Sequence, residues 1–455
     1  MTQGPDGSSA LRLEITDISF PEGWGVARIE GFVFFVPGVV PGDRILARLI
    51  RKTSRYGYAE VLDLECESPL RTTPPCPHFG RCGGCVLQNL QYEKQVDLKE
   101  RYLLQTLRRI GSVDLDNVET EMMVPSAAQY YYRSKVELFF EYRGDRVVLG
   151  FMERVSPLTP SRPRVIPIDT CAIFSKSMER LVPAVRAYAA SLHNAGRTSG
   201  ARQKKQGRLK RITLRESKWD GRLMACLKGS GEETGGLPQF VEAVRREVPE
   251  VASLHILSEG KGRCLYGTPY IEEQLDRFMF RIYPETFFQP NPGTALLLYR
   301  SIAKSAGATG RERVLGLYCG AGPIEIFLSP LVGEVVGIDS SRRNIEDAME
   351  NCRINDIHNC RFYCGKAEDM LAGSGLGRFD IVIVDPPRAG LAEKALGLAA
   401  AVGASRLVYV SCNPATLARD LKRLRQSGYI PRRIQPFDFF PHAAHLETFV
   451  LLERI

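Results

Sequence analysis

From Arg311 onward, short apolar segments alternate with stretches of helical pattern, and this alternation constrains the fold more than any other feature of the sequence. The five strand candidates are RVLGLY, EVVGIDS, CRFYCG, FDIVIVDPP and RLVYVSC. Strands that are separated by helices form parallel sheets, because each helix carries the chain back to the starting edge of the next strand. We therefore predict a doubly wound α/β sheet for the C-terminal part of the chain.

The first part of the chain has a different pattern, in which apolar and polar residues alternate over short distances. Between residues 11 and 64, about five such runs are broken by Gly and Pro, which predicts a small β-barrel of the OB type. An amphipathic helix is expected from about 89 to 110, and Gly111 is expected to end it. Residues from about 120 to 280 mix strand and helix patterns without a repeat, so we expect a central α+β region there.

The chain contains twelve cysteines, and their context limits what they can do. The N-terminal residues lack the basic start and apolar core of a signal peptide, and no run reaches the roughly 20 apolar residues of a membrane span. With 44% apolar residues, the chain does not need disulfide bonds to form a core. We therefore expect a soluble, monomeric, cytoplasmic protein in which clustered cysteines serve a metal or catalysis.

The net charge of +9, from 61 basic and 52 acidic residues, favours an anionic partner. Part of the excess lies in RKTSRYGYAE (51–60), where aromatic side chains suit base stacking and basic ones suit phosphate contact. A second part lies in 197–211, which has seven basic and no acidic residues. Each segment is consistent with RNA contact and equally with a solvated hairpin or loop.

A glycine turn follows the first strand of the C-terminal part, in the order strand, LYCGAG, helix. Gly320 and Gly322 allow a ligand to approach the backbone closely, and Pro323 suits the first position of a helix. The next strand ends at Asp339, whose carboxylate can accept hydrogen bonds from both hydroxyls of a ribose. The third glycine of a dinucleotide-binding motif is replaced by Glu325, so the segment looks like the S-adenosylmethionine site of class I methyltransferases.

Three further reactive side chains lie at strand ends. FDIVIVDPPRAG brings Asp385 to the carboxyl edge of the sheet, where ligands bind in open α/β folds. RLVYVSCNPATLARDL places Cys412 at a strand-to-helix turn, where amide N–H groups are expected to lower the pKa of its thiol. FPHAAHLE puts Glu447 at the start of the last apolar strand, where a buried carboxylate needs a partner or a function.

Cys412 and Glu447 together fit one reaction, the methylation of carbon 5 of uracil. A thiolate that adds to carbon 6 of the ring makes carbon 5 nucleophilic toward a methyl sulfonium. A general base must then remove the proton from carbon 5, so that the thiolate is expelled. Because carbon 6 is hidden in a base stack, the target base has to be flipped out or presented in a loop.

Over nearly its whole length, the sequence resembles the S-adenosylmethionine-dependent RNA (uracil-5-)-methyltransferases, in particular the iron–sulfur branch that acts on 23S ribosomal RNA. Residues 11–65 are similar to the TRAM RNA-binding domain, and CPHFGRCGGC is similar to the cluster loop of the family. The methyltransferase motifs are matched by FFQPN, LYCGAG, DPPRAG, SCNPATLARDL and FPHAAHLE. The resemblance implies that Cys412 is the nucleophile and Glu447 the base. The cofactor-binding residues that it implies are Gln289, Tyr318, Gly320, Gly322, Asp339, Lys366 and Asp385.

The cysteines of CPHFGRCGGC have the spacing C-x5-C-x2-C, which together with one distant cysteine suits either an iron–sulfur cluster or tetrahedral zinc. The resemblance implies a [4Fe–4S] cluster. Its four ligands would be Cys76, Cys82, Cys85 and Cys171. The seven cysteines that have neither this role nor that of the nucleophile are expected to pack in the interior.

The chain is therefore expected to have three parts. A TRAM or OB-like RNA-binding domain is expected at 11–68, a central cluster-bearing domain at 69–285, and a Rossmann-like, class I methyltransferase domain at 286–455. The expected partner is RNA, with a uridine of 23S ribosomal RNA as the substrate and the T-loop uridine of transfer RNA as the main alternative. A cytosine-5 methyltransferase is disfavoured, because the position of its second cysteine reads DPPR.

Three residues depart from the pattern of the family. Gly316 stands in the first strand where an acid is usual, and Pro323 follows the glycine turn in place of a polar residue. Ala443 replaces a common hydroxyl residue in FPHAAHLE. The changes at Gly316 and Pro323 are expected to weaken contacts to the methionine end of the cofactor. A non-catalytic RNA-binding or ribosome-assembly factor with the same fold is therefore the competing hypothesis.

Overall fold

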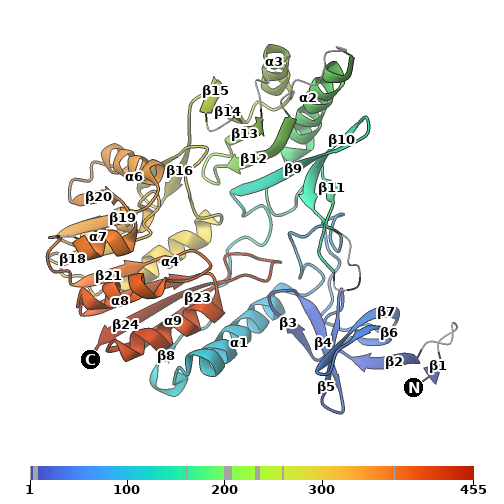
Figure 1. Ribbon diagram of the computed structural model, residues 1–455, viewed down its shortest axis with the longest axis horizontal. Coiled ribbons are helices and arrows are strands. Elements are labelled where there is room, and N and C mark those ends of the chain that lie inside the picture. Colours follow the sequence, from blue (N-terminus) through green and yellow to red (C-terminus); the bar gives the residue numbers. More distant parts are fainter. Residues whose placement is uncertain are drawn as a thin grey trace.

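The computed structural model describes residues 2–3, 9–156, 158, 162–198, 208–230, 236–258, 261–373 and 375–455. Three main sheets follow one another along the chain (Figure 1), so the expected mixed α/β architecture with a β-rich N-terminal region is confirmed. No helix among the described residues is both long and apolar enough to cross a membrane. Residues 199–207 of the basic segment lie outside the described residues, so its contact with RNA stays a prediction.

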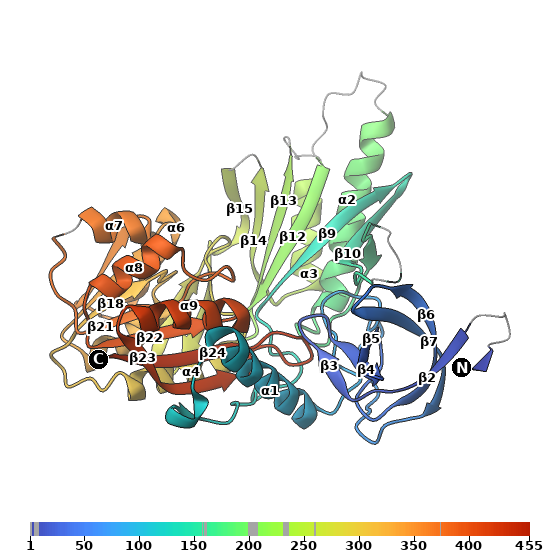
Figure 2. The same cartoon turned by 60° about the horizontal axis from the view of Figure 1, so that its bottom comes forward.

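The N-terminal sheet has seven strands in the order β1-β2-β6-β7-β5-β4-β3. Its strands are β1 (Thr2–Gln3), β2 (Ser9–Glu14), β3 (Asp17–Ser19), β4 (Trp24–Ile29), β5 (Phe32–Val36), β6 (Arg44–Lys52) and β7 (Tyr56–Cys66). β2 also approaches β4, so the sheet curls on itself (Figure 2). Ile45 and Ala47 of β6 are fully buried with Arg44 exposed beside them, which follows the two-residue period of a strand with one solvated face.

The central sheet has seven strands in the order β11-β10-β9-β12-β13-β14-β15. Its elements are β9 (Lys135–Arg143), β10 (Arg146–Met152), β11 (Val165–Pro167), α2 (Met178–Thr198), β12 (Arg208–Glu216), β13 (Leu223–Ser230), α3 (Leu237–Glu247), β14 (Val251–Ser258) and β15 (Lys261–Gly267). α2 and α3 pack together against one face and enclose an apolar core. A hairpin of β16 (Ile271–Leu275) and β17 (Phe278–Ile282) leads from this sheet to the C-terminal one.

The C-terminal sheet has eight strands in the order β20-β19-β18-β21-β22-β24-β23-β8. Its strands after residue 300 are β18 (Arg313–Leu317), β19 (Glu334–Asp339), β20 (Cys360–Cys364), β21 (Ile381–Val384), β22 (Arg406–Ser411), β23 (Tyr429–Phe437) and β24 (Glu447–Arg454). The five strands from β18 to β22 are parallel, as the sequence predicts. The strand order reverses at β18, which is the place where open α/β sheets bind their ligands.

Helices cover both faces of the C-terminal sheet (Figure 1). They are α4 (Pro292–Ser305), α5 (Pro323–Leu328), α6 (Arg342–Ile354), α7 (Ala367–Gly373), α8 (Glu393–Ala401) and α9 (Pro414–Gln426), with a short 3-10 turn, η2 (Ser329–Leu331). The four residues of β21 are all buried, because both faces of a parallel sheet are covered.

Two elements of the central segment join the C-terminal sheet. α1 (Tyr92–Gly111) packs along α9 (Figure 2), and beyond the 3-10 turn η1 (Leu115–Asn117) the short strand β8 (Glu119–Thr120) pairs in parallel with β23. Leu103 and Leu107 of α1 are fully buried in the core of this sheet. Burial of each such side chain contributes roughly 1.5–3 kcal/mol to the stability of the folded state. Part of the segment 69–285, which was expected to form a separate central domain, thus completes the C-terminal fold. The expected boundary between these two domains at residue 285 stays a prediction.

α1 also holds the loop that leads into β24. Lys99 and Asp438 are both fully buried, and Lys99 Nζ donates to Asp438 Oδ1 at 2.7 Å and to the carbonyl oxygen of Phe440 at 2.9 Å. One turn earlier, Gln95 Oε1 accepts from the backbone N–H of His442 at 3.0 Å. The path of the chain toward Glu447 is therefore set by polar contacts with α1.

Lys99→Met is expected to lower the free energy of unfolding by about 3–5 kcal/mol, because it leaves the Asp438 carboxylate buried without its counter-ion. The double variant Lys99→Met/Asp438→Leu should recover much of this loss, because no buried charge remains. Chemical denaturation followed by circular dichroism measures both effects. The control is Lys94→Met on the same helix, because the ion pair of half-buried Lys94 with exposed Asp97 reaches solvent and contributes less than about 1 kcal/mol. Equal losses of unfolding free energy in Lys99→Met and Lys94→Met would contradict the stabilising role of the buried ion pair.

Candidate active site

The carboxyl ends of β18, β19, β21 and β22 lie at one edge of the sheet, because these strands are parallel and in register. A cavity of about 570 Å³ opens at this edge. Seven of the nine residues expected in catalysis or cofactor binding line it: Gln289, Tyr318, Gly320, Asp339, Asp385, Cys412 and Glu447. Of the described residues expected there, Gly322 and Lys366 do not line the cavity.

The glycine turn and Asp339 form one hydrogen-bonded unit. The backbone N–H of Gly320 donates to Asp339 Oδ2 at 3.0 Å, and the backbone N–H of Ser341 donates to Oδ1 at 2.8 Å. Gly320 and Gly322 have φ values of 56° and 77°, which suit glycine, and a Cβ at Gly322 would lie 2.9 Å from the ring of Phe362. Gly322 therefore supports the turn by close packing, while Gly320 faces the cavity.

Lys366 is exposed at the start of α7, beyond the end of β20. Its backbone oxygen accepts from the N–H groups of Asp369 and Met370 and so begins that helix. The structure thus gives Lys366 a place outside the cavity, because β20 is the edge strand and lies two strands away from β18.

Asp385 follows β21 and faces Gln289 from the FFQPN segment. Gln289 Nε2 donates to Asp385 Oδ2 at 3.4 Å, and Gln289 is itself buried. Burial raises the pKa of Asp385 to about 7, and the hydrogen bond from Gln289 opposes this rise. The side chain at the end of β21 is therefore poised to gain negative charge when a cation enters the cavity.

Cys412 and Glu447 lie on neighbouring antiparallel strands. Ser411 of β22 pairs with Thr448 of β24, so Cys412 and Glu447 are the next two residues to face each other. Burial raises the pKa of the Glu447 carboxyl well above its usual value, and the charge of Asp385 adds to this effect. The two side chains expected to be nucleophile and base are thus brought together at the end of one strand pair.

The expected lowering of the Cys412 pKa is wrong. Burial, together with the charges of Glu447 and Asp385, raises the pKa of this thiol to about 12, while the hydrogen bond from its own backbone N–H is the smallest contribution and lowers the pKa. Desolvation in a cavity rich in carboxylates therefore outweighs the effect of the strand-to-helix turn.

Arg388 is a site residue that the sequence reasoning did not single out, although DPPRAG contains it. It lines the cavity, and its positive charge lowers the pKa of both Cys412 and Glu447. Its backbone oxygen accepts from the side chain of Asn413 at 3.0 Å, so the loop after β21 is held to the turn after β22. The available signal was an arginine three residues after the acid at the end of a strand.

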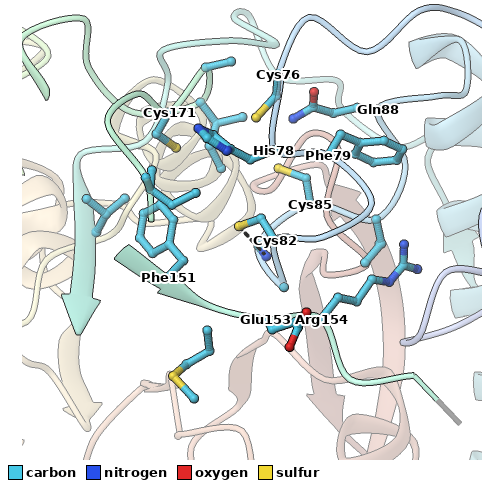
Figure 3. A pocket seen from close by; sticks show the side chains of 18 of the residues that line it. Cys76, His78, Phe79, Cys82, Cys85, Gln88, Phe151, Glu153, Arg154 and Cys171 are labelled. Atoms are coloured by element: carbon cyan, nitrogen blue, oxygen red, sulfur yellow. Dashed lines mark hydrogen bonds between the residues drawn. The ribbon is translucent and has the colours of Figure 1, made fainter. Parts of the chain in front are cut away.

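A second cavity, of about 660 Å³, lies between the N-terminal and central sheets. All four cysteines expected to bind a cluster line it, and Figure 3 shows their side chains directed into the same space. The C-terminal end of the CPHFGRCGGC loop is anchored by two backbone hydrogen bonds, because Gly83 N–H donates to the Met152 oxygen and Val86 N–H to the His442 oxygen. Among the described residues, no group of three or more His, Cys, Asp or Glu side chains is placed so that it could hold a metal ion.

The remaining cysteines are divided between core and surface. Cys226, Cys319 and Cys352 are buried, as expected. Cys264 and Cys364 are exposed, so the expectation that all seven pack in the interior is wrong. Both exposed residues lie on edge strands, β15 and β20, where one side of the strand faces solvent.

The doubly wound sheet, the glycine turn after β18 and the acids at the ends of β19 and β21 define a class I, Rossmann-like methyltransferase. The sequence profile of the tRNA (uracil-5-)-methyltransferases matches residues 252–455. The chain belongs to this family and is an S-adenosylmethionine-dependent RNA (uracil-C5)-methyltransferase.

Relatives match along almost the whole chain. An uncharacterized RNA methyltransferase of Halalkalibacterium halodurans is 32% identical and covers 98% of this chain and 97% of its own length. One from Bacteroides thetaiotaomicron is 35% identical, with 95% and 99% covered. Among solved structures, the Pyrococcus abyssi tRNA (uracil-54, C5)-methyltransferase in complex with S-adenosyl-L-homocysteine is similar, with a TM-score of 0.72, 27% identity, and 97% of this chain and 100% of that chain covered.

Without RNA, Arg388→Gln is expected to slow the alkylation of Cys412 by iodoacetamide about two- to fivefold at mildly alkaline pH, since a screened surface charge contributes roughly 0.5–1 kcal/mol. The thiolate is the reactive form. Loss of the guanidinium raises the thiol pKa further, so a smaller fraction is ionised at any pH below that value. Peptide mapping by mass spectrometry measures the rate, with exposed Cys264 as internal reference.

The matched control is Arg245→Gln, which removes an exposed arginine of α3 that pairs with Glu242. It should leave the Cys412 rate unchanged. A Cys412 rate that is the same in Arg388→Gln and wild type would show that Arg388 does not act on the thiol.

Proposed function

We propose that this enzyme methylates carbon 5 of a uridine through a covalent bond between Cys412 and carbon 6 of the ring. The observation that carries the proposal is the meeting of Cys412 and Glu447 at the end of β22 and β24, in the cavity that also contains Asp339 and Asp385. A nucleophile, a base and carboxylates suited to a cationic cofactor then share one space. S-adenosylmethionine supplies the methyl group from its sulfonium.

Cys412, Glu447 and Arg388 each have one role in the proposed reaction. Cys412 loses its proton to water and its sulfur bonds to carbon 6, while the electron pair of the ring double bond moves to form an enolate. Carbon 5 would then form a bond to the methyl carbon of the sulfonium, and the electron pair of the broken sulfur–methyl bond would stay on sulfur as a neutral thioether. The Glu447 carboxylate removes the carbon 5 proton, the sulfur–carbon bond breaks, and Cys412 leaves as the thiolate. Arg388 favours the charged forms of both side chains by its positive charge.

The cofactor half of the cavity is proposed to lie between Asp339 and Asp385. Both oxygens of Asp339 are held in place by backbone N–H groups, so its remaining lone pairs are positioned to accept ribose hydroxyls. Gln289 orients Asp385 by donating a hydrogen bond from its side-chain amide. Tyr318 completes this half of the cavity with an aromatic ring.

We further propose that Cys76, Cys82, Cys85 and Cys171 hold a [4Fe–4S] cluster. The donor set fits this group, because it consists of four thiols that line one cavity. Each iron of such a cluster takes one thiolate, so its ligands surround a space instead of converging on one ion.

The RNA is proposed to contact an aromatic cluster on the N-terminal sheet as well as the catalytic cavity. This cluster contains Trp24, Phe35, Tyr56 and Tyr58, whose neighbouring ring centroids lie 5.5–6.4 Å apart. Its rings are half-buried and offer faces on which unpaired bases can stack.

A uridine of 23S ribosomal RNA is the proposed substrate, because residues 11–65 and CPHFGRCGGC resemble the branch that acts on it. The second candidate is a uridine of transfer RNA. The similarity of almost the whole chain to the Pyrococcus abyssi tRNA (uracil-54, C5)-methyltransferase favours this candidate.

Cells that lack this protein are expected to lose one 5-methyluridine, and mass mapping of ribosomal and transfer RNA identifies its position. Wild type should restore the modification. Cys412→Ala should restore none, because carbon 5 is not activated, and it should form no covalent RNA adduct. Glu447→Gln should accumulate the adduct, visible as a protein–RNA band under denaturing conditions, because the carbon 5 proton is not removed.

The control for these variants is Cys364→Ala, which removes an exposed cysteine and should restore full modification. Full activity of Cys412→Ala would overturn the proposed mechanism. Loss of 5-methyluridine from transfer RNA alone would select the second substrate.

Cys85→Ser is expected to abolish bound iron and acid-labile sulfide and the visible absorbance of the anaerobically purified protein, because serine is a poor ligand for this soft cluster. Cys226→Ser, which changes a buried cysteine outside the cavity, should keep the iron, the sulfide and the absorbance. Stoichiometric zinc in the wild type, without sulfide, would contradict the cluster.

A further inference from the structure

Glu325 is a buried acid that none of the proposed roles uses. It lies in α5, directly after the glycine turn, it is 2% exposed, and it lines the catalytic cavity. Its Oε2 atom is buried and has no hydrogen-bond partner among the described residues. A carboxylate in this position needs a cation or a proton from elsewhere.

The carboxyl group of Glu325 occupies space that Gly316 leaves empty. A Cβ built at Gly316 would lie 2.0 Å from Glu325 Oε1, so any side chain at residue 316 would displace this carboxyl. Gly316 is also the position in β18 where the family pattern has an acid. The glycine and the glutamate therefore form a pair, in which a carboxyl from the helix lies where a carboxyl from the strand would otherwise project.

The surroundings of Glu325 favour a cationic ligand. Burial raises its pKa to about 8, and the charges of Asp385 and Asp339 add to this rise. Among the described residues, the cationic side chains that line the cavity are Arg133, Lys135 and Arg388, and none of these three forms an ion pair with Glu325. A positive group from a ligand would therefore relieve an unfavourable accumulation of acids.

We propose that Glu325 binds the α-ammonium group of S-adenosylmethionine and replaces the acid that β18 lacks. This inference rests on the proposed assignment of the cavity to the cofactor. The ammonium is the one group of this cofactor that is both cationic and a hydrogen-bond donor, so it can satisfy Oε2 directly. The ribose hydroxyls are served by Asp339 at the next strand end, and the cofactor carboxylate would be repelled by Glu325.

The position of Glu325 changes the effect on cofactor binding that is expected from Gly316. Taken alone, the missing strand acid predicts weak contacts to the methionine end of the cofactor. With Glu325 in the same space, the contact is kept and only the element that supplies it has changed. The competing non-catalytic hypothesis thereby loses its strongest support in the sequence.

The test compares two ligands by isothermal titration calorimetry, S-adenosylhomocysteine and 5′-methylthioadenosine, of which only the first carries the ammonium. Glu325→Gln is expected to weaken the binding of S-adenosylhomocysteine about 10- to 100-fold, which is the effect of losing a charged hydrogen bond. The dissociation constant of 5′-methylthioadenosine should change by no more than about twofold. Equal weakening of both ligands, or of neither, would overturn the proposal.

A residue swap gives an independent test. Glu325→Ser alone should bind S-adenosylhomocysteine weakly, and Gly316→Asp/Glu325→Ser should recover affinity, because the strand then supplies the carboxylate. Failure of the swap to recover any affinity in a folded protein would count against the shared position. Thermal unfolding without ligand checks folding, and Glu325→Gln should melt no lower than wild type, because it removes a buried unpaired acid.

Asp339→Ala separates this proposal from the assignment of the cavity. It should weaken both ligands, since both carry the ribose. If Asp339→Ala weakens the binding of neither ligand, the cofactor binds elsewhere and the proposed site is wrong. If it weakens both while Glu325→Gln weakens neither, the site is right and the role of Glu325 is wrong.

Discussion

The buried ion pair between Lys99 and Asp438 links parts of the chain that are 339 residues apart in sequence. It fixes the loop before β24, and the cysteine-bearing loop binds the same segment through the backbone oxygen of His442. The register of β24 then decides that Glu447 faces Cys412. Because neither charge can reach water, the geometry of the catalytic pair depends on a contact that tolerates little change.

Burial also sets the electrostatics of the catalytic cavity. Asp385, Cys412 and Glu447 all have raised pKa values, with desolvation as the largest cause in each case. The raised pKa values favour the neutral forms of these three side chains, and a cation in the cavity would favour the charged forms. Arg388 supplies part of the positive charge, and a cationic cofactor would supply the rest. The reactivity of the Cys412 thiol and the Glu447 carboxyl therefore depends on whether the cationic cofactor is bound.

Local patterns were the part of the fold that could be predicted. The helix expected at about 89–110 is observed as Tyr92–Gly111, and the five parallel strands are where apolar runs indicated them. The packing of α1 on α9 and the pairing of β8 with β23 could not be predicted, because these contacts join segments hundreds of residues apart. The pKa of Cys412 was misjudged for a related reason, since desolvation depends on all the elements around the thiol.

The sequence by itself determined which side chains stand at strand ends. Asp339, Asp385 and Cys412 follow apolar runs, and parallel strands bring such residues to one edge whatever the rest of the fold does. Only the tertiary structure decided that Glu447 faces the thiol, that Lys366 lies outside the cavity, and that the carboxyl of Glu325 fills the space beside Gly316. The physical reason is that strand periodicity is a local property, whereas burial and the sharing of space depend on how distant segments pack.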